Sequence, residues 1–221
     1  MNGPAAWIEF AAAFAVFLVS HSLPVRPGVK ARLVARMGAR GFTLAYSLVS
    51  LAALAWLISA AVRAPVIPLW DWALWQNQTT AAAMFLACII AALALGRPNP
   101  LSFGGARNAS FDRQNPGIVG WVRHPLLVAL ALWSLSHLLA NGTLALVLLF
   151  GTFALFSLLG MRMIDARKRR EMGAAEWREL TDLPREIRLT RNGLLRVLTG
   201  AVAFAILLEL HGPVIGVQPA L

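Results

Sequence analysis

Four histidines are the residues best suited to chemistry in this chain, and each lies within or at the end of an apolar segment. They are His21, His124, His137 and His211. An ionisable side chain is costly to bury in a membrane, so its presence there indicates a function by default. Imidazole is a common metal ligand and an axial ligand of haem iron. Four such residues together favour a metal or haem site, whereas any single one serves equally well as a structural hydrogen-bonding group.

The tripeptide Arg123-His124-Pro125 joins two basic side chains to the start of an apolar segment. Proline suits the first position of a helix because the amide hydrogen that it lacks would have no partner there. Arg123, His124 and the N-terminus of that helix could together bind an anion such as a carboxylate or a phosphate. The alternative is a basic anchor at the membrane surface.

Several catalytic motifs are missing from the sequence. It contains no phosphate loop, no HExxH and no GxSxG, and with Cys88 as its single cysteine it has no paired-cysteine metal site. The sequence therefore has no pattern for an ATPase or a serine hydrolase. The net charge of +10 would suit a nucleic-acid-binding protein, but the basic residues lie in loops between apolar segments, so we expect no nucleic-acid partner.

The elements that must position these residues are apolar spans. Of the 221 residues, 58% are apolar and 14% are charged, and the mean hydropathy is +0.66. These values exclude a disordered protein, a disulfide scaffold and an ordinary soluble domain. A bilayer-spanning helix needs about 20 mostly apolar residues, and hydropathy predicts such spans at 5–23, 43–62, 79–96, 125–140, 143–161 and 194–210. We expect an all-α polytopic membrane protein with about six transmembrane helices, as a single domain over residues 1–221.

The distribution of charge predicts how these spans are oriented. Nearly all basic residues fall in the loops that follow the first, third and fifth spans. Because cytoplasmic loops carry the excess of Lys and Arg, we expect a multi-pass protein of the bacterial inner membrane, with both termini in the periplasm. The fifth loop is predicted to form a cytoplasmic juxtamembrane helix from Ile164 to about Leu180, in which Asp165 faces Arg169 four residues on.

Depth in the membrane then suggests which histidines can meet. His21 ends the first span and His124 begins the fourth, both on the cytoplasmic side. His137 lies about 20 Å further along its helix, near the outer face, and His211 ends the sixth span on that face. By depth alone, the natural pairs are His21 with His124 and His137 with His211.

The segment 117–142 resembles the NnrU family. It contains Arg123-His124-Pro125, then Trp133-x-x-x-His137, then Leu138-Leu139-x-Asn141-Gly142. The family is associated with denitrification, that is, with nitrite and nitric oxide metabolism. It is similar to the plant and cyanobacterial 15-cis-zeta-carotene isomerase, a membrane enzyme with haem b that acts on a lipophilic substrate. This similarity implies that His21 and His137 are axial ligands of haem, a pair that differs from both depth pairs. Ser134 stands where that enzyme has a cysteine, so the isomerase reaction itself does not follow.

A wider resemblance supplies a second hypothesis. Arg123-His124-Pro125, followed by Gly173, Glu176 and Trp177, looks like the isoprenylcysteine and phospholipid methyltransferases. It implies that Arg123 holds the carboxylate of S-adenosylmethionine and that Glu176 holds its amino or ribose group. Leu127 departs from this pattern, because those enzymes usually have tyrosine there. A third hypothesis is a membrane assembly factor without catalytic activity, so the sequence leaves open whether the protein is an enzyme.

Overall fold

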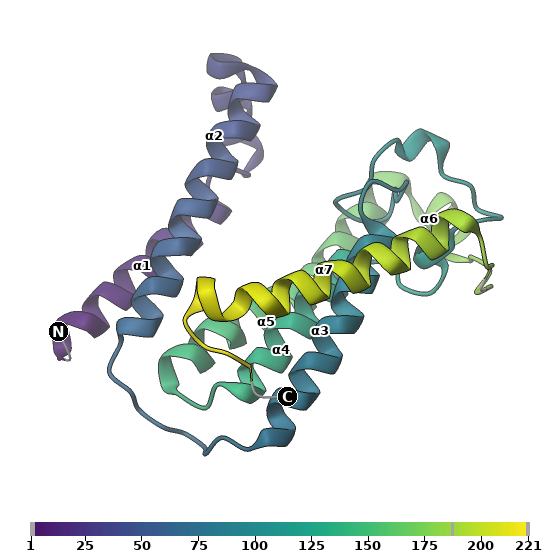
Figure 1. Cartoon of the computed structure of the whole chain (residues 1–221). Coiled ribbons are helices and arrows are strands. Elements are labelled where there is room, and N and C mark those ends of the chain that lie inside the picture. Colours follow the sequence, from purple (N-terminus) through teal and green to yellow (C-terminus); the bar gives the residue numbers. More distant parts are fainter. Residues whose placement is uncertain (1–2, 187, 220–221) are drawn as a thin grey trace. The chain divides into compact units, whose positions relative to one another are not determined.

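The computed structural model describes residues 3–186 and 188–219, and its regular elements are helices (Figure 1). Their bounds are α1 Pro4–Ser22, α2 Pro27–Arg63, α3 Leu74–Ala94, α4 Pro125–Ala140, α5 Leu144–Met172, α6 Ala174–Thr181 and α7 Arg191–Ile215, with the short 3-10 helices η1 Asn108–Ser110 and η2 Gly117–Gly120. Within the described residues there is no strand, only an isolated bridge between Pro68 and Thr143. The predicted all-α class is confirmed.

Five of these helices, α1, α2, α3, α5 and α7, are long and apolar enough to cross a membrane, and α4 is a shorter apolar helix of 16 residues. Each of the six spans predicted from hydropathy falls within or overlaps one of these six helices, but α2 begins 16 residues before its predicted span and α5 ends 11 residues after its own. Large apolar side chains lie on the outside of the helices, among them Ile8, Val62 and Leu194. Such a surface is stable in lipid and not in water, as expected of a polytopic membrane protein.

The described chain divides into two compact units. The first comprises the chain as far as Trp70 together with Thr143–Leu149, and its main contact is that of α1 with α2. Phe10, Phe17 and Leu57 form its buried core. Glu9 on α1 pairs with Arg63 at the end of α2, at 2.5 Å, and accepts a hydrogen bond from Trp56 Nε1 at 3.2 Å. The one acidic group in the first span is therefore paired.

Helix α2 is longer than a bilayer requires because it includes most of the first basic loop. Its first part carries Lys30, Arg32 and Arg36. The helix is interrupted at Gly38, where φ is 73° and ψ is 165°. That backbone conformation is open to glycine and strained for other residues. The basic segment before Gly38 and the apolar span after it can therefore run in different directions.

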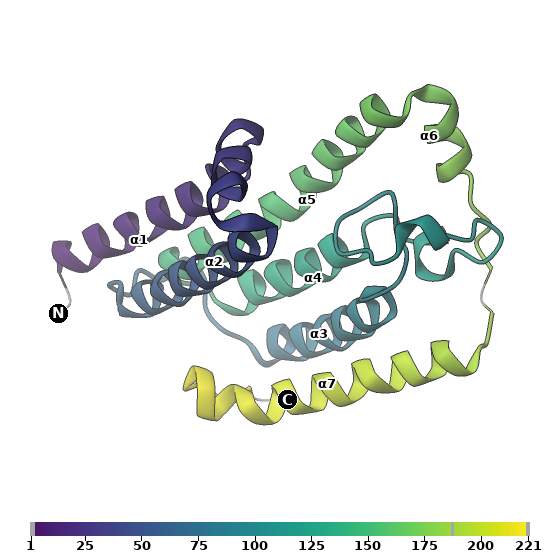
Figure 2. The same ribbon diagram turned by 90° about the horizontal axis from the view of Figure 1, so that it is seen from above.

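In the second unit, which comprises Asp71–Gly142 and the chain from Phe150 onward, α3 packs between α4 and α7 (Figure 2). Ala87, Ile90 and Ala129 form the core of the α3–α4 contact. On the other side, Gly200 of α7 approaches α3 so closely that a Cβ on it would lie 2.7 Å from the Cα of Ile89. Arg196 Nη1 donates to the carbonyl oxygens of Ala92 and Leu95, at 2.8 and 2.7 Å, and so satisfies carbonyls that a helix end leaves free.

The predicted juxtamembrane helix is present, but its bounds were wrong. Helix α5 continues without a break from the apolar span to Met172, and a separate helix, α6, begins at Ala174. The break falls at Gly173, whose φ of 85° disfavours any other residue. The sequence pattern missed this break because the charge spacing of a helix continues across it.

Candidate functional site

The start of α4 is fixed by a hydrogen-bonded loop built around Asn99. This residue is buried, and its backbone N–H donates to Asn108 Oδ1 at 2.9 Å. Its side chain accepts from the N–H of Leu101 at 3.1 Å and donates through Nδ2 to the carbonyl oxygen of Arg123, also at 3.1 Å. A Cβ on Gly105 would lie 2.8 Å from both the N and O atoms of Asn99. The loop thus needs glycine at 105 and holds the backbone of Arg123 in place.

The same loop region holds an acidic side chain outside the spans. Asp112 accepts from Asn115 Nδ2 at 2.7 Å and from the N–H of Gln114 at 2.9 Å. The hydrogen bond from Asn115, followed by that from Gln114, lowers the pKa of Asp112 below its ordinary value. These bonds fold the chain between η1 and η2 into a turn.

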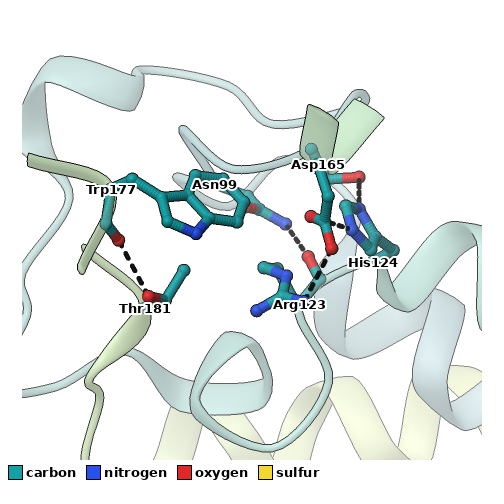
Figure 3. Close-up of polar contacts among 7 residues, drawn as sticks. Asn99, Arg123, His124, Asp165, Trp177 and Thr181 are labelled. Atoms are coloured by element: carbon teal, nitrogen blue, oxygen red, sulfur yellow. Dashed lines mark hydrogen bonds and ion pairs between the residues drawn. The ribbon is translucent and has the colours of Figure 1, made fainter. Parts of the chain in front are cut away.

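His124 is buried, and both of its ring nitrogens have partners. Nδ1 lies 2.9 Å from Ser102 Oγ, and Nε2 lies 2.8 Å from Asp165 Oδ1 (Figure 3). A carboxylate only accepts hydrogen bonds, so Nε2 carries the proton. In this arrangement neither nitrogen is free to ligate iron, which places His124 apart from the other histidines.

Asp165 also binds Arg123, so one carboxylate joins both basic residues of the tripeptide. Arg123 Nη2 lies 2.7 Å from Asp165 Oδ2, and the guanidinium carbon lies 5.3 Å from the centre of the Trp177 ring. The predicted pairing of Asp165 with Arg169 is not among the ion pairs of the described residues. Helix α5 instead supplies Asp165, and α6 supplies Trp177, to the start of α4 (Figure 3).

The hydrogen-bonded chain of hydroxyl, imidazole and carboxylate resembles a hydrolase triad and is formed by Ser102, His124 and Asp165. The Ser102 hydroxyl, however, is poorly placed to attack a substrate. The Ser102 residue is only 7% exposed and is not among those that line the neighbouring cleft. A nucleophile must reach its substrate. We therefore assign these three residues to the positioning of Arg123 and to the packing of the loop.

A cleft of about 270 Å³ opens beside Arg123. We call it the Arg123 cleft, and it is lined by Leu101, Val119, Gly120, Trp121, Arg123, Thr181, Asp182, Leu183 and Arg185. Its two walls touch at Gly120, where a Cβ would lie 2.4 Å from the carbonyl oxygen of Pro184. Glu176 is exposed on α6 and does not line the cleft, whereas its neighbour Trp177 contacts Arg123.

His137 lies at the other end of α4, in an aromatic environment. Its Nδ1 lies 2.8 Å from the carbonyl oxygen of Trp133, and its ring centre lies 5.6 Å from that of Trp133 and 5.2 Å from that of Phe150. Because a carbonyl only accepts, Nδ1 carries the proton. In the neutral ring this leaves a lone pair on Nε2, which makes no hydrogen bond to any described residue.

His21 in the first unit has the same arrangement. Its Nδ1 lies 2.9 Å from the carbonyl oxygen of Phe17 and 3.3 Å from Ser20 Oγ, and its ring centre lies 4.0 Å from that of Phe17. Tyr46 donates its hydroxyl to the carbonyl oxygen of His21 at 3.4 Å. Here too, Nε2 has no hydrogen-bond partner in the described part of the chain.

His211 completes the set on α7. Its Nδ1 lies 2.6 Å from the carbonyl oxygen of Val217. Across residues 3–186 and 188–219, no three His, Cys, Asp or Glu side chains gather in a way that could hold a metal ion. Haem iron differs from such a site because the porphyrin supplies four nitrogens and the protein only the axial ligands.

The sequence pointed to the histidines and to Arg123 but not to Asp165, Ser102 or Asn99 as their partners. Asp165 is the first acidic residue after the fifth span. An acidic side chain that close to a membrane is expected to pair with a cation. The partners of Asp165, however, lie 42 and 41 residues away. Spacing along one helix could not have found them.

Comparison with known proteins agrees with the resemblance noted in the sequence. No curated protein and no solved structure matches the chain. A family profile described as NnrU protein matches residues 9–219. The match includes the histidines, the Asn99 loop, the start of α4 and the Arg123 cleft, so the chain belongs to the NnrU protein family.

Proposed function

We propose that this membrane protein binds haem b and that His137 ligates the iron. The observation that carries the proposal is the state of the imidazole. Metal-bound histidines donate their second ring nitrogen to a carbonyl or carboxylate, which fixes the tautomer and makes the ligating nitrogen more basic. His137 is already in that state, with Nδ1 on the carbonyl oxygen of Trp133 and the Nε2 lone pair open.

The surroundings of His137 are aromatic and of low polarity. Trp133 and Phe150 pack against the imidazole ring, and the Trp133 ring centre lies 5.3 Å from that of Phe150 and 5.4 Å from that of Phe153. A low-polarity environment excludes water from a haem and influences its potential. Ser134 is fully buried, and its hydroxyl donates to the carbonyl oxygen of Leu130 at 2.8 Å. It therefore supports the helix and leaves imidazole as the ligand type.

His21 is the second ligand candidate. Its imidazole shows the same tautomer, fixed by Phe17, and the same open Nε2. The similarity to the haem-containing isomerase also implies that His21 is an axial ligand. His211 is the alternative that depth in the membrane suggests, and it too has Nδ1 on a carbonyl oxygen. Haem, when bound, would supply redox chemistry or ligand binding at the iron, in keeping with nitrite or nitric oxide metabolism or with a lipophilic substrate.

The test is the absorption spectrum of the full chain expressed with adequate haem supply. The wild-type protein should be red and show a Soret band. His137→Gly should lose that band, because the iron loses its imidazole, and added imidazole should restore it. Rescue separates the loss of a ligand from misfolding.

Two matched variants identify the second ligand. His21→Ala should shift or abolish the Soret band, whereas His211→Ala should leave it unchanged. The reverse result would assign the second position to His211. A colourless wild-type protein that stays colourless after haem is added would overturn the proposal.

The methyltransferase hypothesis finds partial support in the site. That hypothesis assigns S-adenosylmethionine binding to Arg123 and Glu176. Arg123 lines the Arg123 cleft, and Glu176 does not. The haem proposal rests on an imidazole whose hydrogen bond already fixes the tautomer that a metal ligand needs, so it is the function that we favour.

We also propose that the membrane is the bacterial inner membrane, with the Arg123 cleft and the basic part of α2 on the cytoplasmic side. The support is the concentration of Lys and Arg in alternate loops. Both termini then lie in the periplasm.

A further inference from the structure

We propose that the Arg123 cleft binds the phosphodiester headgroup of a membrane lipid. This site is separate from the haem ligands and does not rest on them. Four features of the cleft support the proposal: the unfilled hydrogen-bonding capacity of Arg123, a second cation, the charge balance of the walls and a place beside the first residue of an apolar helix.

Arg123 has more donors than the protein provides with acceptors. Nη2 binds Asp165, and Trp177 covers one face of the guanidinium. Nε is enclosed without a hydrogen-bond partner, and Nη1 makes no hydrogen bond to the residues that the structure describes. A charged group with unmet donors is costly to keep out of water. The side chain is 39% exposed and lines the cleft, so an anion held there can accept from the part of the guanidinium that is not enclosed.

A second cation faces the same cleft. Arg185 follows α6, lines the cleft and forms no ion pair within the described segments. Two guanidinium groups around one opening form a typical phosphate site, because each presents several donors in one plane. Thr181 also lines the cleft, but its hydroxyl hydrogen is donated to the carbonyl oxygen of Trp177 at 2.8 Å, so the two arginines supply the donors.

The balance of charge selects among phosphate compounds. Asp165 neutralises Arg123, and Asp182 faces the cleft with Arg185. The walls therefore carry no large positive excess. Because Asp182 repels negative charge, a phosphodiester with one negative charge is favoured over a monoester with two. Glycerophospholipids carry such a phosphodiester.

The position of the cleft identifies the source as a lipid. Arg123 lies two residues before Pro125, the first residue of α4, and Trp121 in the cleft wall is 51% exposed. Arginine and tryptophan together are typical of the level of the headgroups, where one end of a side chain is wet and the other apolar. A cleft at the end of a membrane helix opens where lipid phosphates lie.

The experiment is native mass spectrometry of the delipidated full chain in a phosphate-free detergent, titrated with dioleoylphosphatidylglycerol. Dioleoylglycerol has the same chains without the phosphate, and inorganic phosphate and S-adenosylmethionine are the soluble comparators. We expect the phospholipid to bind at least about tenfold more tightly than dioleoylglycerol, because only its phosphate can accept charge-assisted hydrogen bonds from the two arginines.

The variants separate this site from general attraction to a basic protein. Arg185→Gln alters an exposed side chain and should weaken phospholipid binding by about tenfold, and Arg123→Gln should do the same if it folds. Arg178→Gln is the matched control, because Arg178 is an exposed residue of α6 outside the cleft lining. It should change binding by less than about twofold.

Three results would overturn the proposal. One is equal binding of phospholipid and dioleoylglycerol, and another is an equal effect of Arg178→Gln and Arg185→Gln. The third is S-adenosylmethionine or inorganic phosphate binding in an Arg185-dependent way while phospholipid does not, which would assign the cleft to a soluble ligand. The Soret band is read separately, so failure here leaves the haem proposal standing.

Discussion

Asp165 is a single residue on which the start of α4 depends, because its two oxygens bind the two basic side chains that precede Pro125. One accepts from Arg123 at 2.7 Å and the other lies 2.8 Å from His124 Nε2. Its side chain is 26% exposed, so these bonds form largely out of water. A residue in that position contributes more than a surface ion pair does.

Asp165→Asn should therefore destabilise the protein. Asparagine keeps the shape but loses the charge, so Arg123 loses its counterion and His124 its best acceptor, at a cost of about 1–3 kcal/mol. The measurement is the thermal unfolding midpoint in detergent. Asp182→Asn is the control, since Asp182 is an exposed acid with no ion pair in the described chain. Equal midpoints for wild type and Asp165→Asn would contradict the role assigned here.

At the level of single residues, the sequence proposed candidate site residues but not the contacts that they make. His21, His137 and Arg123 were predicted from residue type and local context, and the tautomer of each histidine then follows from an acceptor four residues earlier in the same helix. The partners of Arg123 and His124 come from α5, α6 and the loop after α3. Such contacts depend on tertiary packing, which no local spacing encodes.

At the scale of elements, helix positions were predicted well and helix ends less well. Hydropathy located the six apolar helices because burial in lipid demands continuous apolar character. It failed where a helix extends beyond the membrane, as α2 does before Gly38 and α5 does as far as Met172. Both deviations end at a glycine with positive φ, a backbone feature that composition alone does not reveal.

The contact between α3 and α7 depends on a glycine. Gly200→Ala would place a Cβ 2.7 Å from the Cα of Ile89 and 2.9 Å from the carbonyl oxygen of Cys88. Both are backbone atoms, so the helices must separate, and we expect a loss of about 1–3 kcal/mol from overpacking. Close approach through small residues is a general way in which membrane helices associate.

Thermal unfolding in detergent again provides the measurement, with Gly28→Ala as the control. A Cβ on Gly28 meets nothing within 4 Å, so that variant should unfold at the wild-type temperature or slightly above it, because alanine favours a helix. If Gly200→Ala were as stable as the wild type, the two helices could not be packed as closely as described.

At the scale of the whole molecule, the two most prominent properties are an apolar exterior and an uneven distribution of charge along the chain. The apolar exterior is explained by lipid, since a water-soluble protein does not expose so many large apolar side chains. The charge distribution has two explanations. It either orients the chain in the membrane or serves only to attract anionic lipid.

Topology mapping separates these explanations. If charge orients the chain, the turn at Asn141–Gly142 and the segment around Trp72 lie in the periplasm, while the Asn99 loop and α6 lie in the cytoplasm. Fusions of alkaline phosphatase, which is active only when exported, should then be active after residues 72 and 142 and inactive after residues 110 and 182. Fusions of green fluorescent protein at the same four places should give the opposite pattern.

Removing the charge from one loop gives the sharper result. Replacing Lys30, Arg32 and Arg36 by glutamine removes most of the basic charge before Gly38 while leaving the apolar part of α2 intact. If those residues fix the orientation of the first two helices, alkaline phosphatase fused at residue 72 should lose activity in this variant. If the later loops orient the chain instead, alkaline phosphatase activity at residue 72 should be unaltered. The role of the basic segment before Gly38 would then be to attract anionic lipid.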